Sequence, residues 1–228
     1  MKPEKNQLLG VLLVSMGALA LEIVLTRIFS VTMWYHFAFL AISLALMGSA
    51  TAGVALYFFP RLTQPDKARR AIATLAGLLA ISVPIVFWVY LQIPFEPVLM
   101  NRESWFGGAQ FGWLALIYLV LSVPFFLNGM IISLALSAWS ADAGRVYWAD
   151  LTGASIGCLV SILALEQLGG TGALLAISVV LAVAGVVLVQ DWRQGWQRAA
   201  WPLLATLVVA GAFAWQLRQP WLTITVNQ

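Results

Sequence analysis

Residues 8–28 read LLGVLLVSMGALALEIVLTRI, and this stretch decides the fold. A helix rises about 1.5 Å per residue, so a stretch of this length crosses a hydrocarbon core about 30 Å thick. The run is longer than the roughly 7 to 15 apolar residues of a signal peptide, and it contains Glu22 and Arg27. We therefore expect a membrane span that is retained in the protein.

The rest of the chain has the same character. Of its 228 residues, 62% are hydrophobic and 9% are charged, and the mean hydropathy is +0.92. Soluble domains are about half apolar and a quarter charged, so this composition indicates a membrane protein and leaves no room for a soluble catalytic domain. The single cysteine, Cys158, and the single histidine, His36, exclude a disulfide framework, a cysteine-rich metal cluster and a haem held by two histidines of this chain.

We expect an all-α polytopic bundle of about seven spans that forms one integral-membrane domain over residues 1–228. The apolar runs predict spans at residues 8–28, 34–59, 71–93, 111–139, 146–168, 173–190 and 199–217. The connection at 61–70 is predicted to be a basic loop, and 94–110, with its prolines and glycine pair, an extended or re-entrant interfacial loop. Residues 169–172, which read GGTG, predict a tight turn.

The basic residues predict the orientation of these spans. An odd number of spans places nine of the twelve bases on the side of the N-terminus: Lys2, Lys5, Arg61, Lys67, Arg69, Arg70, Arg145, Arg193 and Arg198. Arg27, Arg102 and Arg218 fall on the other side. Because cytoplasmic loops carry an excess of lysine and arginine, we expect a cytoplasmic N-terminus and an external C-terminus, in a bacterial inner membrane.

Four charged residues lie inside the predicted spans, where each costs on the order of 2.5 to 3.5 kcal/mol unless it is paired or hydrated. The predicted depths bring Glu22, Arg27 and Glu166 close to His36 at the outer side. This polar cluster is interpreted either as a site for a cation, an amine or a proton, or as an ion pair that fastens the first span to the fifth. The second interpretation is the more ordinary one.

Asp150 is expected to form a second intramembrane acidic site. It precedes Glu166 by about 16 residues, and hence by roughly 24 Å along one helix, so the two carboxylates do not share a site. Arg145 or Arg193 is its expected neighbour. Three acidic residues against one deeply placed base would suit a cation better than an anion.

No cofactor, metal site or catalytic residue is predicted, because the chain has no phosphate-binding loop, dinucleotide fingerprint, H-E-x-x-H or C-x-x-C pattern. His36 beside Trp34 and Tyr35 fits an interfacial residue with a hydrogen-bonded ring better than a ligand to a haem or another pigment. The spread of the bases among the loops gives no sign of nucleic-acid binding.

Small residues in two spans predict close helix packing. Gly48 and Gly53 lie on the second span, and Gly153 and Gly157 form a G-x-x-x-G pair on the fifth. Asn128, one turn after Pro124, fits an interhelical hydrogen bond beside a kink better than an unwound helix that lines a pathway.

Two stretches form distinctive motifs: residues 17–27, GALALEIVLTR, with the small residues at 48–53, and residues 146–157, VYWADLTGASIG. The first resembles the opening helix pair, and the second the Y-x-A-D-x-x-G-x-x-x-G helix, of the integral-membrane domain of spermidine-synthase-like proteins. The family couples such helices to a Rossmann-like aminopropyltransferase domain that binds decarboxylated S-adenosylmethionine and a polyamine. No part of this chain matches that domain, so the resemblance implies membrane motifs without the transferase chemistry.

Three functions are therefore compatible with the sequence. The first is a non-catalytic structural or assembly subunit of a larger membrane complex, with the lipid bilayer and other membrane-protein subunits as partners. The second is a binding or transport protein for a polyamine or another organic cation. The third is a membrane anchor for an aminopropyltransferase on a separate chain or in a segment cut from this one.

Overall fold

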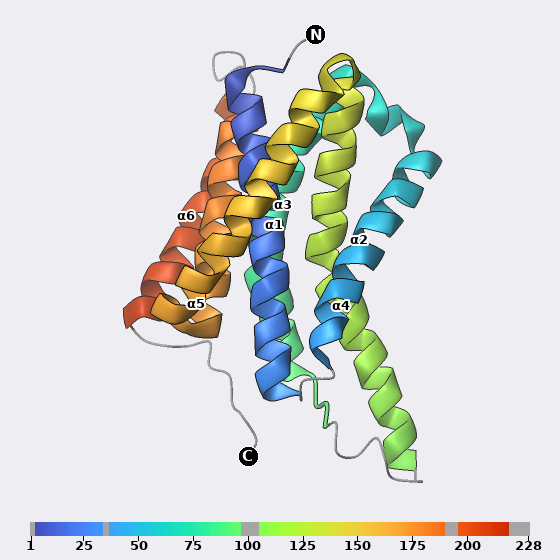
Figure 1. Ribbon diagram of the computed structural model, residues 1–228, viewed down its shortest axis with the longest axis vertical. Coiled ribbons are helices and arrows are strands. Elements are labelled where there is room, and N and C mark those ends of the chain that lie inside the picture. The colour runs from blue at the N-terminus through green and yellow to red at the C-terminus, as the bar shows by residue number, and fades with distance from the viewer. Residues whose placement is uncertain (1–2, 34–36, 97–104, 190–195, 219–228) are drawn as a thin grey trace.

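The computed structural model describes residues 3–33, 37–96, 105–189 and 196–218, and every element in these ranges is helical (Figure 1). The longer helices are α1 (Lys5–Thr32), α2 (Ala38–Phe58), α3 (Pro65–Gln92), α4 (Trp105–Ala138), α5 (Ala143–Val187) and α6 (Trp196–Arg218). Two short 3-10 helices, η2 (Pro60–Thr63) and η4 (Ser140–Asp142), lie at the α2–α3 and α4–α5 connections. The predicted all-helical bundle is thus the observed architecture.

Five of these helices, α1 to α5, are long and apolar enough to cross a membrane, and α6 contains a shorter apolar segment, Trp201–Gln216. A helix satisfies its own backbone hydrogen bonds, which is the requirement that lipid imposes on any exposed segment. The chain is a multi-pass membrane protein whose apolar outer surface suits a lipid bilayer.

The predicted span 146–168 and all but the last three residues of the predicted span 173–190 lie within α5, which reverses direction at Gly169. This glycine has φ 69° and ψ −180°, a conformation that only glycine adopts readily. Contacts with α1 show the reversal. Gly153 and Gly157 of the first arm (residues 143–168) meet α1 at Leu12 and Met16, whereas the second arm (residues 170–187) and the residues just after it run the opposite way, with Leu181 beside Gly17 and Leu188 beside Gly10.

Helix α1 is the central element of the bundle and packs most extensively against both arms of α5. Its fully buried side chains include Val11, Val14, Val24 and Phe29. The Phe29 ring packs edge to face on Tyr90 of α3, with ring centroids 5.8 Å apart. Helix α1 begins at the upper end of the bundle in Figure 1, and α6 finishes at the lower end.

Two predicted loops are partly helical. Helix α3 begins at Pro65, so much of the expected basic loop 61–70 forms η2 and the first turns of α3. Proline suits this first position because its missing N–H would have no helical partner there. Helix α4 begins at Trp105, so the end of the expected loop 94–110 is also helical, while residues 97–104 lie outside the described residues.

Candidate functional site: polar residues inside the bundle

Asp150, on the first arm of α5, is held by a serine of α1. The Ser15 hydroxyl donates a hydrogen bond of 2.5 Å to Oδ1 of Asp150. Ser15 is buried and Asp150 is half-buried, so this bond lies within the α1–α5 contact. Of the two arginines expected beside Asp150, Arg145 is exposed and forms no ion pair with a described residue, and Arg193 lies outside the described residues.

Gly153 and Gly157 bring the backbones of α1 and α5 into direct contact. A Cβ at Gly153 would overlap the carbonyl oxygen of Leu12, and one at Gly157 would overlap that of Met16. Both glycines share a helix face with Asp150, because residues three and four apart project to the same side of a helix. The A-D-x-x-G-x-x-x-G segment therefore places one polar contact and two backbone contacts on α1.

A second glycine contact joins α2 to α4. A Cβ at Gly48 would lie 2.6 Å from Cβ of Phe125, and one at Gly129 would lie 2.9 Å from Cα of Ser49. The sequence near Pro124 predicts a kink at Asn128 and Gly129 but no packing role for Gly129. Gly53 differs from the packing role expected for it, because it is exposed and a Cβ added there would meet no heavy atom within 4 Å.

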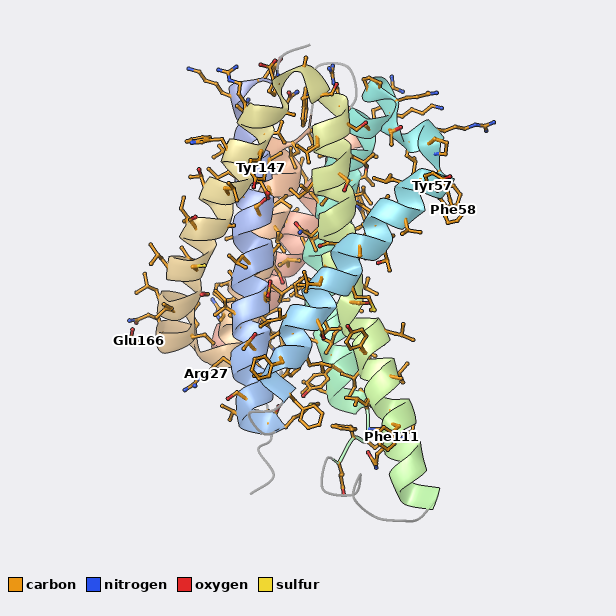
Figure 2. The ribbon with its side chains drawn as sticks, turned by 45° about the vertical axis from the view of Figure 1, so that its right-hand side comes forward. Arg27, Tyr57, Phe58, Phe111, Tyr147 and Glu166 are labelled. Carbon is orange, nitrogen blue, oxygen red and sulfur yellow. The ribbon has the colours of Figure 1, made fainter. Side chains whose placement is uncertain are left out.

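The outer polar cluster is not joined by hydrogen bonds or ion pairs in the described part of the chain. Arg27 and Glu166 are exposed and lie toward the same end of the bundle (Figure 2). Glu22 is half-buried on α1. His36 lies outside the described residues. The expected ion pair between the first and fifth spans is therefore corrected: Arg27, near a helix end, extends outward toward the interface instead, as long basic side chains do.

Asn128 is a half-buried residue whose side-chain oxygen is enclosed by the described helices. Its Oδ1 is enclosed and has no hydrogen-bond partner among the described residues. Helix α4 continues through Pro124 and Asn128, so neither the expected interhelical hydrogen bond nor an unwound segment is observed. The carboxamide is thus an acceptor without a described donor in the middle of a long apolar helix.

The described residues also line two cavities. An open one of about 380 Å³ on α6 is lined by Gly211, Ala214, Trp215 and Arg218. A small apolar cavity of about 50 Å³ lies where α1 faces both arms of α5, and Met16, Ala20, Ala164 and Ile177 are among its lining residues. Within the described ranges, no group of three histidine, cysteine, aspartate or glutamate side chains could hold a metal ion. The geometry assigns Asp150, Gly153 and Gly157 to helix packing, and it leaves Glu22 and Glu166 on other surfaces of the bundle.

No family model, curated protein or solved structure matches this chain.

Proposed function

We propose that this chain is a non-catalytic structural or assembly subunit of a larger membrane complex, and that it binds a helix of another subunit through the outer face of α2. This face consists of Phe39, Ile42, Leu46, Ser49, Gly53 and Tyr57, which recur every three or four residues. All six residues are exposed. The observation that carries the proposal is the pair of small residues Ser49 and Gly53 between large exposed side chains on this one face.

Gly48, Gly153 and Gly157 lie where helices touch, and each meets the backbone of another helix. Gly53 instead meets nothing within 4 Å, as do Gly112 and Gly211. Gly53 also forms a small-x-x-x-small pair with Ser49. In lipid there is no hydrophobic force between helices, so association depends on close packing at such small residues.

The low burial of α2 supports the same interpretation. Of an apolar 18-residue stretch in each helix, 28% is buried in α2, compared with 56% in α1 and 50% in α3. Phe39, Leu46 and Tyr57 are 73%, 68% and 81% exposed. These large side chains flank the small residues, and together they would form a knob-and-groove surface for a partner helix.

The proposal includes seven crossings of a bacterial inner membrane, with the N-terminus in the cytoplasm. Each arm of α5 and α6 would then cross once, in addition to α1 to α4. The distribution of charge supports this orientation, because the end where α1 begins carries most of the described bases: Lys5, Arg61, Lys67, Arg69, Arg70 and Arg145. Arg27 and Arg218 lie toward the other end.

A relationship to the spermidine-synthase-like membrane domains is also part of the proposal. Its support is the pattern of the two stretches together with the packing of the second on α1 at Leu12 and Met16, just before the first stretch begins at Gly17. Nothing in this relationship brings transferase chemistry to the chain.

The test measures the mass of the particle that contains this chain, extracted from its native membrane into polymer-bounded lipid discs at endogenous expression. We expect a mass well above one chain. Gly53→Leu should reduce it to the single chain by blocking the outer face of α2. Gly112→Leu is the matched control, because Gly112 also has open space around it but lies on α4. A wild-type protein found only as a single chain would refute the proposal, as would a Gly53→Leu assembly of unchanged mass.

A further inference from the structure

The segment that joins α2 to α3 carries a strongly basic surface. Residues 60–70 contain four basic residues and one acidic residue, Asp66. Arg61 on η2 and Lys67 and Arg70 on α3 are exposed, and none of these three forms an ion pair with a described residue. Their charges are therefore presented outward at the end of the bundle where α1 begins (Figure 1).

Three exposed aromatic residues immediately precede this basic segment. Tyr57, Phe58 and Phe59, at the end of α2, are 81%, 70% and 63% exposed. The rings of Tyr57 and Phe58 pack edge to face with centroids 5.7 Å apart, and Figure 2 shows both side chains projecting from the outer end of α2. Apolar rings and cations thus follow each other along one short part of the surface.

We propose that the α2–α3 segment is a docking surface for anionic phospholipids, in which Arg61, Lys67 and Arg70 bind the headgroup phosphate and Tyr57, Phe58 and Phe59 contact the glycerol-ester region and upper acyl chains. The inference rests on the membrane placement proposed above, but not on the partner subunit. It adds a ligand class to a surface that the assembly proposal uses only at Tyr57.

The chemistry of the segment favours this ligand. Guanidinium groups bind phosphate oxygens through paired, charge-assisted hydrogen bonds, and an ammonium adds a point charge. Aromatic rings favour the headgroup level of a bilayer, where one part of the environment is apolar and the rest is hydrated. A free phosphate would satisfy the cations alone, whereas a phospholipid satisfies the cations and covers the rings.

The test measures how strongly purified protein restricts the motion of spin-labelled phosphatidylglycerol compared with spin-labelled phosphatidylcholine in vesicles of the two lipids. A basic residue near an anionic surface contributes roughly a fivefold gain in affinity. We therefore expect wild-type protein to prefer phosphatidylglycerol, and Arg61→Gln/Lys67→Gln to lower this preference by about fivefold or more. High salt should weaken the preference as well, since the attraction is electrostatic.

The matched control is Lys5→Gln/Arg145→Gln, which removes the same two charge types from exposed positions at the same end of the bundle but away from the α2–α3 segment. Its loss of preference should be distinctly smaller. The charge-retaining pair Arg61→Lys/Lys67→Arg should keep the wild-type preference, and unchanged helicity of all variants separates lipid binding from folding.

Three results would overturn the inference. If wild-type protein restricts phosphatidylglycerol and phosphatidylcholine equally, the cations would instead serve an acidic protein partner. If the site variant and the control variant lose the same amount of lipid preference, the preference would come from the total charge at that end of the bundle. Full competition by dissolved glycerol phosphate would identify a soluble ligand. The mass measurement on the native assembly is independent of all three, so either proposal can fail while the other stands.

Discussion

Replacing Gly153 with alanine should separate α1 from the first arm of α5. The added Cβ would overlap the Leu12 carbonyl oxygen and lie 2.8 Å from the carbonyl carbon and 2.9 Å from Cα of Leu12. All three atoms belong to the backbone, so no side-chain rotation relieves the overlap. The helices must move apart by about 0.7 Å or more to bring the nearer of these carbons to an ordinary contact distance of about 3.5 Å.

The cost follows from what this movement disturbs. A gap of about 0.5 to 1 Å forfeits a quarter to a half of the dispersion energy of each contact it opens, and overpacking of this kind costs about 1 to 3 kcal/mol. The same movement stretches the bond from Ser15 to Asp150, and interhelical bonds in membranes contribute about 0.6 kcal/mol on average. Alanine returns up to about 1 kcal/mol of helix propensity. We expect a net loss of about 1 to 3 kcal/mol in the free energy of unfolding.

The measurement is reversible unfolding in mixed detergent micelles, followed by far-ultraviolet circular dichroism. Gly112→Ala serves as the control, because its Cβ would enter open space and it should be neutral or slightly stabilising. If Gly153→Ala has the same unfolding free energy as Gly112→Ala, the backbone contact on which the α1–α5 packing depends would be refuted.

Three other substitutions test separate contacts. Ser15→Ala, Asp150→Ala and the double variant should show a coupling of about 0.6 to 1.7 kcal/mol in a double-mutant cycle of unfolding, and zero coupling would contradict the hydrogen bond between these residues. Gly169→Ala should lower the unfolding free energy by about 1 to 3 kcal/mol, because the backbone at this residue has φ 69° and ψ −180°, which alanine adopts only with strain. Gly211→Ala is its control, because a Cβ there would enter open space. Equal stability of the two variants would contradict the reversal of α5. Asn128→Leu should raise the unfolding free energy by about 1 to 3 kcal/mol, since it removes a buried acceptor without a described donor, and a loss of stability would show that the carboxamide is bonded.

The fold class could be predicted from the sequence because bilayer thickness imposes a length that apolar runs must reach. Residues 8–28 lie wholly within α1, and the glycine-rich stretch at 169–172 contains the reversal of α5. The basic stretch 61–70 was harder to predict. Charge and proline suggested a loop there, but a helix tolerates both at its first turn, so α3 begins at Pro65.

The contacts between polar residues could not be predicted in the same way. Depth along a helix follows from residue number, but the direction of a side chain around the helix depends on which neighbours pack against it. Glu22 and Arg27 are five residues apart and therefore point to different sides of α1. Ser15 was overlooked because a serine in an apolar run has no distinct signal, although it shares the helix face of Leu12 that meets α5.

Asp150 shows why charge alone was an uncertain guide to a binding site. A carboxylate in a membrane helix suggests a ligand because its burial is costly, and that cost is reduced equally well by a hydroxyl on the next helix. Here the two glycines that bring α1 close to α5 also bring Ser15 within 2.5 Å of the carboxylate. The same close approach therefore explains the glycines and the acid together. Gly53 on α2 and the exposed cations Arg61, Lys67 and Arg70 have no such counterpart among the described residues, so another molecule has contacts to gain there.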